Sequence, residues 1–250
     1  MITIKSKHEI ELMRTAGEMV GLTHKYLKPF LKEGITTGEI DKLAGEYIYS
    51  LGGIPSSLGY EGYPGNICIS INDEVVHGIG GSRKLKNGDI VTLDIVVGYK
   101  GYHGDSAWTY AVGDIDDNKK YLMEHTEKAL YEGIKQVKPG NRVGDISNAV
   151  EEYATSHNLG VVVELEGHGI GTNMHEDPGV PNYGTKGTGP LLKEGMVICI
   201  EPMLTFGEPD IYMLEDNWTI KTDDGLDAAH YEHTVLVTSD GYEILTKRMD

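Results

Sequence analysis

The amino-acid sequence contains an internal repeat, and this repeat restricts the possible folds more than any other feature. Residues 31–50 align without gaps with residues 137–156, at a shift of 106 positions, and residues 85–94 align with 192–201 at a shift of 107. Chance similarity of two helix-plus-strand segments is the alternative, but a nearly constant shift across two separated blocks favours duplication. We therefore predict two related halves, at approximately residues 8–110 and 117–240.

Each half has the pattern of long helices followed by antiparallel strands. Apolar residues recur at helical spacing over residues 8–31 and 117–137. Several runs resemble strands, namely "NICISIN", "DIVTLDIVV", "SAWTYAV", "VVVELEG", "MVICIEPM" and "EHTVLVTS". No linker separates the halves, so we expect one domain over residues 1–250. The expected class is α/β (α+β), with the strands of both halves in a shared sheet and helices on its outer face.

Two aspartates interrupt the otherwise apolar stretch "VTLDIVVGYKGYHGDSAW" at residues 91–108. If this stretch forms a hairpin about a turn at 98–101, Asp94 and Asp105 lie directly opposite each other. Their Cβ atoms would then be about 4.5–5.5 Å apart, a separation at which like charges destabilise a sheet. A shared proton, a basic neighbour or a metal ion could relieve the repulsion.

The second half adds two further carboxylates. Glu201 in "VICIEPM" is the repeat partner of Asp94, and Glu232 in "HYEHTVLV" lies on the strand that corresponds to Asp105. One proton cannot neutralise four carboxylates from four strands, whereas two divalent cations balance their charge. We therefore predict a dinuclear metal centre.

Three histidines at strand ends are candidates for the same site. His168 in "EGHGIG" is the expected imidazole ligand, because the flanking glycines allow close approach. These glycines lack the G-x-G-x-x-G spacing of a dinucleotide site. His77 in "EVVHGIG" and His175 in "TNMHEDPGVP" could donate hydrogen bonds to a developing oxyanion. His233 is left open, and the remaining histidines are expected to be exposed or packing residues: His8, His24, His103, His125, His157 and His230.

Charge and composition exclude several classes of protein. The formal net charge of −17 disfavours DNA as a partner. Cys68 and Cys199 lie in apolar runs without zinc-like spacing, so both are expected to be buried thiols. The sequence has neither the apolar core of a signal peptide nor a membrane-spanning stretch, which favours a cytoplasmic protein without membrane contact. We expect a monomer.

The five predicted ligands and their flanking sequences resemble type I methionine aminopeptidase over nearly the whole chain. The resemblance rests on "GYEGYPGNICISINDEVVHGIG", "GHGIG" followed by "MHEDP", "CIEPM" and "YEHT". It implies the pita-bread fold, with two pseudo-symmetric halves and a curved sheet around two divalent ions, which could be Mn, Fe, Co or Zn. It also implies hydrolysis of the first peptide bond by metal-activated water, which removes the N-terminal methionine of nascent proteins that have a small second residue.

The resemblance also implies individual roles. Asp94 would bind one ion, His168 and Glu201 the other, and Asp105 and Glu232 both. Glu201 would move protons, His175 would stabilise the tetrahedral intermediate, and His77 would contact the substrate backbone. The methionine side chain would be bound by residues that match or replace the family's pocket: Tyr60, Tyr63, Cys68, Met174 and Trp218.

Three positions depart from the family pattern, since Ser57, Glu61 and Met174 stand where type I enzymes commonly have cysteine, histidine and phenylalanine. The loop 206–217 is acidic, so only the short basic segment 81–86 is a candidate for a weak ribosome contact. The alternatives are an Xaa-Pro aminopeptidase or dipeptidase, which usually carries a preceding domain, and a non-catalytic peptide-binding protein, which would lack ligands. A type II enzyme would need a helical insertion between Glu201 and Glu232, where only 30 residues lie.

Overall fold

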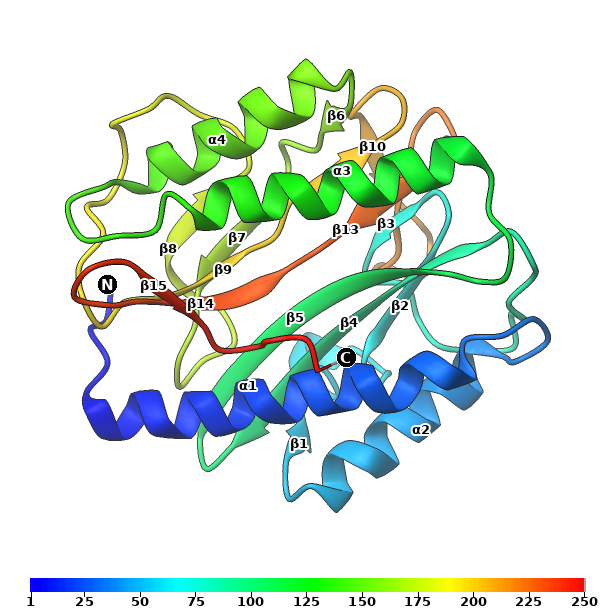
Figure 1. Ribbon diagram of the computed structural model, residues 1–250. Coiled ribbons are helices and arrows are strands. Elements are labelled where there is room, and N and C mark those ends of the chain that lie inside the picture. The colour runs from blue at the N-terminus through cyan, green and yellow to red at the C-terminus, as the bar shows by residue number, and fades with distance from the viewer. Residues whose placement is uncertain (250) are drawn as a thin grey trace.

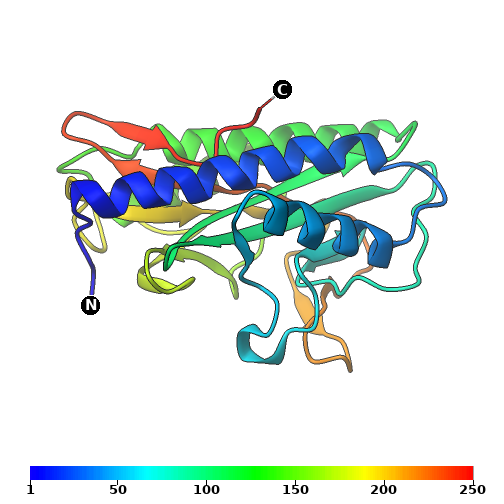
Figure 2. The ribbon, with the colours of Figure 1, turned by 90° about the horizontal axis from the view of Figure 1, so that it is seen from below.

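The computed structural model describes residues 1–249 and contains four α-helices, of which the two longest lie on the same side of a set of antiparallel strands (Figures 1 and 2). The helices are α1 (Lys7–Leu27), α2 (Thr37–Ser50), α3 (Asp117–Ile134) and α4 (Val143–Ser156), with short 3₁₀ turns at Lys28–Phe30 and Tyr60–Gly62. Helix α1 ends before the expected residue 31, because Pro29 cannot continue the helical hydrogen bonds. None of the described helices is long and apolar enough to cross a membrane.

The strands form four small sheets. One has the order β1-β4-β2 with β5 beside β4, and another has the order β15-β14-β9-β7-β8. The three-stranded sheets have the orders β13-β10-β6 and β11-β12-β3. The strands are β1 (Ile54–Pro55), β2 (Cys68–Ile71), β3 (Glu74–Val76), β4 (Ile90–Tyr99), β5 (Tyr102–Ala111), β6 (Gly160–Val161), β7 (Glu166–Gly169), β8 (Glu176–Pro181), β9 (Val197–Ile200), β10 (Met203–Thr205), β11 (Ile211–Met213), β12 (Ile220–Thr222), β13 (Ala228–His230), β14 (His233–Val237) and β15 (Tyr242–Ile244).

The predicted register of the first hairpin was wrong by two residues. Strands β4 and β5 remain paired as far as Tyr99 and Tyr102, so Asp94 lies opposite Ala107 and not opposite Asp105. The turn has only two residues, Lys100 and Gly101, both with positive φ (48° and 84°). Such a tight turn matches the twist of the strands and lets the ladder continue to its edge. The two aspartates are therefore diagonal neighbours on one face of the hairpin, and their carboxylates still approach each other.

Repeat-related positions make the same contacts in both halves. Gly34 N donates to Leu85 O at 2.8 Å, and its repeat partner Gly140 N donates to Leu192 O at 3.3 Å. Both glycines have φ near 90°, at 95° and 92°. The helices that follow, α2 and α4, both have 14 residues. The duplicated sequence thus forms duplicated local structure, and the predicted fold class of helices and antiparallel strands is confirmed.

The two halves meet where β5 lies beside the segment 230–234. Glu232 N donates to Ala107 O at 2.8 Å, and Ser106 Oγ donates to Glu232 O at 2.6 Å. Asp105 N donates to Thr234 Oγ1 at 2.9 Å. Because the backbone atoms of Asp105 and Glu232 make these bonds, the positions of the two acids are coupled across the junction.

Candidate functional site

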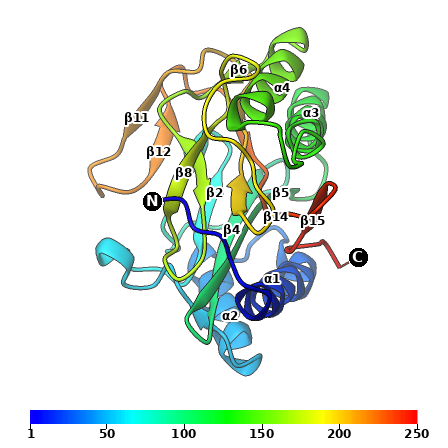
Figure 3. The same ribbon diagram turned by 90° about the vertical axis from the view of Figure 1, so that its left-hand side faces the viewer.

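A cavity of about 650 Å³ contains all the residues predicted to form the site. Asp94 and Asp105 project from β4 and β5, His168 projects from β7, Glu201 follows β9, and Glu232 lies between β13 and β14. Trp218, which lines the cavity, lies in the loop that joins β11 to β12, and this hairpin lies on the side of the strands away from α1 and α3 (Figure 3). Helices α1 and α3 thus cover one side of the strands, and the site lies on the other side.

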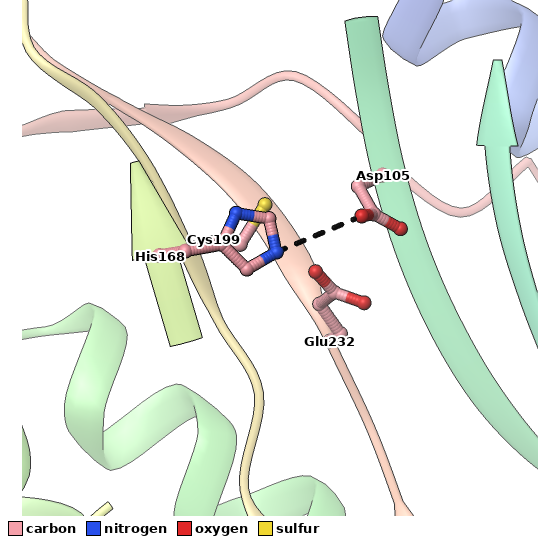
Figure 4. A group of neighbouring side chains, drawn as sticks. All are labelled: Asp105, His168, Cys199 and Glu232. Atoms are coloured by element: carbon pink, nitrogen blue, oxygen red, sulfur yellow. Dashed lines mark ion pairs between the residues drawn. The ribbon is translucent and has the colours of Figure 1, made fainter. Parts of the chain in front are cut away.

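The acidic side chains and the predicted imidazole converge at the base of this cavity. His168 Nε2 lies 3.5 Å from Glu201 Oε1 and 3.9 Å from Asp105 Oδ2. Figure 4 shows the carboxylates of Asp105, on β5, and Glu232, on the segment between β13 and β14, facing the His168 ring. Ligand atoms of Asp105, His168 and Glu232 lie within 4.8 Å of one another. Residues from both halves therefore come together as the repeat predicted.

Burial makes this cluster of carboxylates costly to ionise. Burial, followed by the charges of Glu232 and Asp94, raises the pKa of Asp105 well above its ordinary value. Burial is also the main cause of the raised pKa of Asp94, and of the strongly raised pKa of both Glu201 and Glu232. The reason is the loss of hydration together with mutual repulsion. The carboxylates are therefore poised to bind protons or cations.

Unpartnered oxygen atoms show that this donor set fits divalent cations. Asp94 Oδ1, Asp105 Oδ1 and Glu232 Oε1 are buried and have no hydrogen-bond partner among residues 1–249. A buried polar atom without a partner costs about 1–3 kcal/mol. Carboxylate oxygens with an imidazole are typical ligands of first-row divalent metals. Burial lowers the pKa of His168 to about 4, so its imidazole is neutral near pH 7, as a metal ligand must be.

Cys199 also lies near the cluster but behaves as the buried thiol that the sequence predicted. Its Sγ lies 3.6 Å from Thr234 Oγ1, and its side chain packs in an apolar cluster with Met13 and Ile170. Burial raises the pKa of its thiol well above the ordinary value. Since the thiolate is the metal-binding form, this environment disfavours Cys199 as a ligand.

The expectation that His230 is an exposed or packing residue was wrong. Its side chain lines the cavity, and Nε2 lies 3.6 Å from Glu201 Oε2. The signal in the sequence was its position two residues before Glu232, which places both side chains on one face of an extended segment. The other five histidines of that group lie outside the cavity lining, and His233, which was left open, is buried against Thr246.

His175 and His77 stand on the walls of the cavity. Tyr60 Oη lies 2.8 Å from His175 Nδ1, and the rings of His175 and His168 meet edge to face with centroids 4.3 Å apart. His77 has its ring centroid 6.4 Å from that of Trp218. Burial lowers the pKa of His77 to about 4 and also lowers that of His175, so both imidazoles are neutral near pH 7.

The predicted side-chain pocket is assembled from distant loops. The rings of Tyr63 and Trp218 meet edge to face with centroids 5.0 Å apart. Tyr63 Oη donates to Gly78 O at 2.8 Å, which fixes its ring. Cys68 and Met174 are buried and line the same cavity. Ser57 and Glu61, two of the positions that depart from the family pattern, also line it.

A buried ion pair holds the loop that carries Met174 and His175. Lys5 Nζ lies 2.7 Å from Glu176 Oε2, and the two side chains are only 5% and 9% exposed. The other carboxylate oxygen of Glu176 accepts a hydrogen bond of 3.1 Å from Asn173 N. One glutamate thus connects the N-terminal segment to the loop between β7 and β8, next to His175.

We expect Lys5→Met to lower the free energy of unfolding by about 3 kcal/mol, because removing one partner of a buried pair leaves an uncompensated charge. The double variant Lys5→Met/Glu176→Leu should recover part of this loss. Arg14→Met is the matched control, because its ion pair with Glu243 is 38% and 31% exposed. Exposed pairs contribute at most about 1 kcal/mol. Urea unfolding measures the free energy of unfolding of the three variants. If Lys5→Met loses no more stability than Arg14→Met, the buried pair does not have the proposed role.

Comparison with known proteins gives consistent matches over the whole chain. A sequence model described as "Metallopeptidase family M24" matches residues 11–239. "Methionine aminopeptidase 1" of Bacillus subtilis is 50% identical over 247 residues, which cover 99% of this chain and 100% of that protein. The crystal structure of methionine aminopeptidase from Rickettsia prowazekii superposes with a TM-score of 0.98 at 42% identity and covers 99% of this chain and 100% of that one.

More distant structures share the fold alone. A prolidase from Pyrococcus furiosus superposes with a TM-score of 0.80 at 23% identity, and the match covers 99% of this chain but only 66% of that one.

Proposed function

The chain belongs to metallopeptidase family M24, and on this premise we propose that it removes the N-terminal methionine from nascent proteins and peptides. The observation that carries the proposal is the 50% identity to a methionine aminopeptidase over 247 residues, combined with one cavity that is lined by all five ligand candidates. The enzyme is a metal-dependent hydrolase that acts at the first peptide bond.

The residues proposed to hold two divalent ions are Asp94, Asp105, His168, Glu201 and Glu232. When bound, such ions polarise a carbonyl group and lower the pKa of a bound water, which supplies a nucleophile near neutral pH. Mn, Fe, Co and Zn all suit a donor set of this kind. The unpartnered carboxylate oxygens and the neutral His168 imidazole support this assignment.

Glu201 is proposed to transfer protons. Its side chain is 13% exposed, so it faces the cavity while remaining largely dehydrated. Burial raises its pKa well above the ordinary value, and the nearby charges of Asp94 and Glu166 add to the shift. A carboxylate that faces the cavity can accept a proton and return it to the leaving amine.

His175 is proposed to stabilise the developing oxyanion. When Tyr60 Oη donates to Nδ1 over 2.8 Å, the neutral ring carries its proton on Nε2 and presents this N–H as a donor. A preorganised donor in a buried site stabilises charge that develops in the transition state. His77, which also lines the cavity, is proposed to contact the substrate backbone.

Substrate selectivity is proposed to come from the apolar part of the cavity. Tyr63, Trp218, Cys68 and Met174 form walls that suit a long, unbranched side chain. Contacts between a thioether and an aromatic ring contribute about 0.3–1.5 kcal/mol each. Methionine side chains adapt their shape more readily than aromatic ones, so with Met174 in the wall we expect some activity toward leucine and norleucine side chains. A small second residue is preferred because the cleft is narrow beyond the first peptide bond in the family.

The peptides Met-Ala-Ser, Met-Leu-Ser, Leu-Ala-Ser and Ala-Pro-Ser test this function through kcat/KM with metal added. We expect Met-Ala-Ser to be cleaved fastest and Leu-Ala-Ser to be slower by about 10- to 200-fold, the range for methylene-scale differences in an apolar pocket. Fastest cleavage of Ala-Pro-Ser would instead identify an Xaa-Pro peptidase. If none of the four peptides is cleaved, the peptide-binding alternative gains support.

The setting of the reaction is also proposed. We expect a cytoplasmic monomer that meets its substrates as nascent chains emerge, with a weak ribosome contact through residues 81–86. Within this segment Arg83 is paired with Glu74 at 2.7 Å, which limits the basic charge available to RNA.

A further inference from the structure

His230 is a buried imidazole without any hydrogen-bond partner. Its exposure is 1%, and neither Nδ1 nor Nε2 has a partner among residues 1–249. A neutral imidazole carries one donor and one acceptor, and leaving them unsatisfied in the interior costs stability. Such a side chain is free to bind a group that the protein itself does not supply.

The backbone holds this imidazole firmly in the cavity. Two hydrogen bonds to Thr109 fix the backbone of His230. Its N–H donates to Thr109 Oγ1 at 3.1 Å, and its carbonyl oxygen accepts from the same hydroxyl at 3.0 Å. The residue also pairs with Met203 in the sheet. Its side chain lines the same cavity as Glu232, two residues further along the chain. The ring is therefore directed into the acidic cluster by the strand and not by a packing partner.

The distance between His230 and Glu201 is too long for a hydrogen bond but suits two side chains that bind the same ion. His230 Nε2 and Glu201 Oε2 are 3.6 Å apart, beyond the usual 2.7–3.2 Å of a hydrogen bond. Two atoms that each bind one ion at about 2.0–2.2 Å, at right or tetrahedral angles, lie about 2.8–3.6 Å apart. The ligand atoms of Glu201, His230 and Glu232 all lie within 4.8 Å of one another.

From these observations we propose that His230 is a sixth protein ligand of the metal centre, in the group formed with Glu201 and Glu232. The centre then has two imidazoles, His168 and His230, beside four carboxylates. Imidazole nitrogen suits Co, Zn and Fe, whereas carboxylate and water oxygens suit Mn. His230 therefore shifts the metal preference of this enzyme away from Mn and toward Co or Zn.

The test uses the full chain with His230→Phe, which keeps a ring but removes both nitrogens, and His230→Gln, which keeps polarity without an imidazole. The dissociation constants of Co²⁺ and Mn²⁺ are measured by calorimetry. Loss of a group that hydrogen-bonds to a metal ligand weakens metal binding about 10- to 100-fold, and loss of a direct ligand should weaken it at least as much. We expect this loss for Co²⁺ and a smaller one for Mn²⁺. His77→Phe is the matched control, because His77 lines the same cavity outside both ligand groups.

A spectroscopic measurement on the unmodified protein keeps the inference falsifiable if both variants fail to fold. X-ray absorption of the fully Co²⁺-loaded protein should show an average of one imidazole per ion, against one for every two ions if His168 acts alone. Unchanged Co²⁺ affinity in a folded His230→Phe, or the lower imidazole count, overturns the proposal.

This inference rests on the proposed metal centre, but its failure is distinguishable from failure of the proposed function. Wild-type protein that cleaves Met-Ala-Ser but shows the lower imidazole count retains the function and loses the sixth ligand. Protein that binds ions through two imidazoles but cleaves no methionyl peptide retains the sixth ligand and loses the proposed function.

Discussion

Asp105→Asn and Glu232→Gln should each abolish peptide hydrolysis. Each substitution removes a carboxylate that would help to hold the ions, and bound ions would supply several kcal/mol of charge stabilisation in the transition state. Since about 1.4 kcal/mol corresponds to a factor of ten, we expect kcat/KM for Met-Ala-Ser to fall by at least about 10³-fold. Hydrolysis assays with added Co²⁺ or Mn²⁺ measure the loss. Full activity of chelator-treated, metal-free wild type would contradict the mechanism.

Thermal unfolding gives a control that does not depend on activity. Metal removal should destabilise the wild type, because Asp105 and Glu232 must then be buried as free carboxyl groups. Their pKa values are raised in the folded state, mainly by burial. Metal-free protein should therefore lose stability as pH rises above about 4, where the unfolded chain releases its protons. Asp105→Asn should reduce this pH dependence in metal-free protein while removing the stabilisation that added metal gives to the wild type.

His175→Ala should lower kcat for Met-Ala-Ser by about 10²- to 10³-fold, which is the usual effect of removing one oxyanion donor. The loss should appear in kcat more than in KM, because the donor acts on charge that develops only in the transition state. Tyr60→Phe removes only the hydrogen bond of 2.8 Å to Nδ1 and should have a smaller effect.

Measuring Co²⁺ binding by the His175→Ala variant distinguishes direct oxyanion stabilisation from an indirect effect on the metal ligand His168. The rings of His175 and His168 are in contact, with centroids 4.3 Å apart, so loss of His175 could disturb a ligand. His175→Ala that binds Co²⁺ as the wild type does, but turns over slowly, supports direct oxyanion stabilisation. Wild-type kcat in this variant would exclude it.

Local sequence determined the helices and turns of both halves and the direction of side chains along each strand. The repeat predicted that residues 31–50 and 137–156 have the same local structure, because matched glycines with positive φ and matched apolar spacing impose the same turns and helices on both segments. Alternation along each strand likewise indicated that the carboxylates share one face, since side-chain direction in a strand has a period of two.

Only the tertiary structure decided which of these side chains contact one another and how deeply they are buried. The hairpin register depended on a two-residue turn, which moved Asp94 from Asp105 to Ala107 without removing either carboxylate from the cavity. The pair Lys5 and Glu176 joins residues 171 positions apart in the sequence. His230 seemed ordinary in sequence because its neighbours Ala228 and Ala229 are small and apolar, and its proximity to Glu201 arises from strand packing. Periodicity reports the direction of a side chain within its own strand, whereas the distance to a side chain on another strand depends on how the whole chain packs.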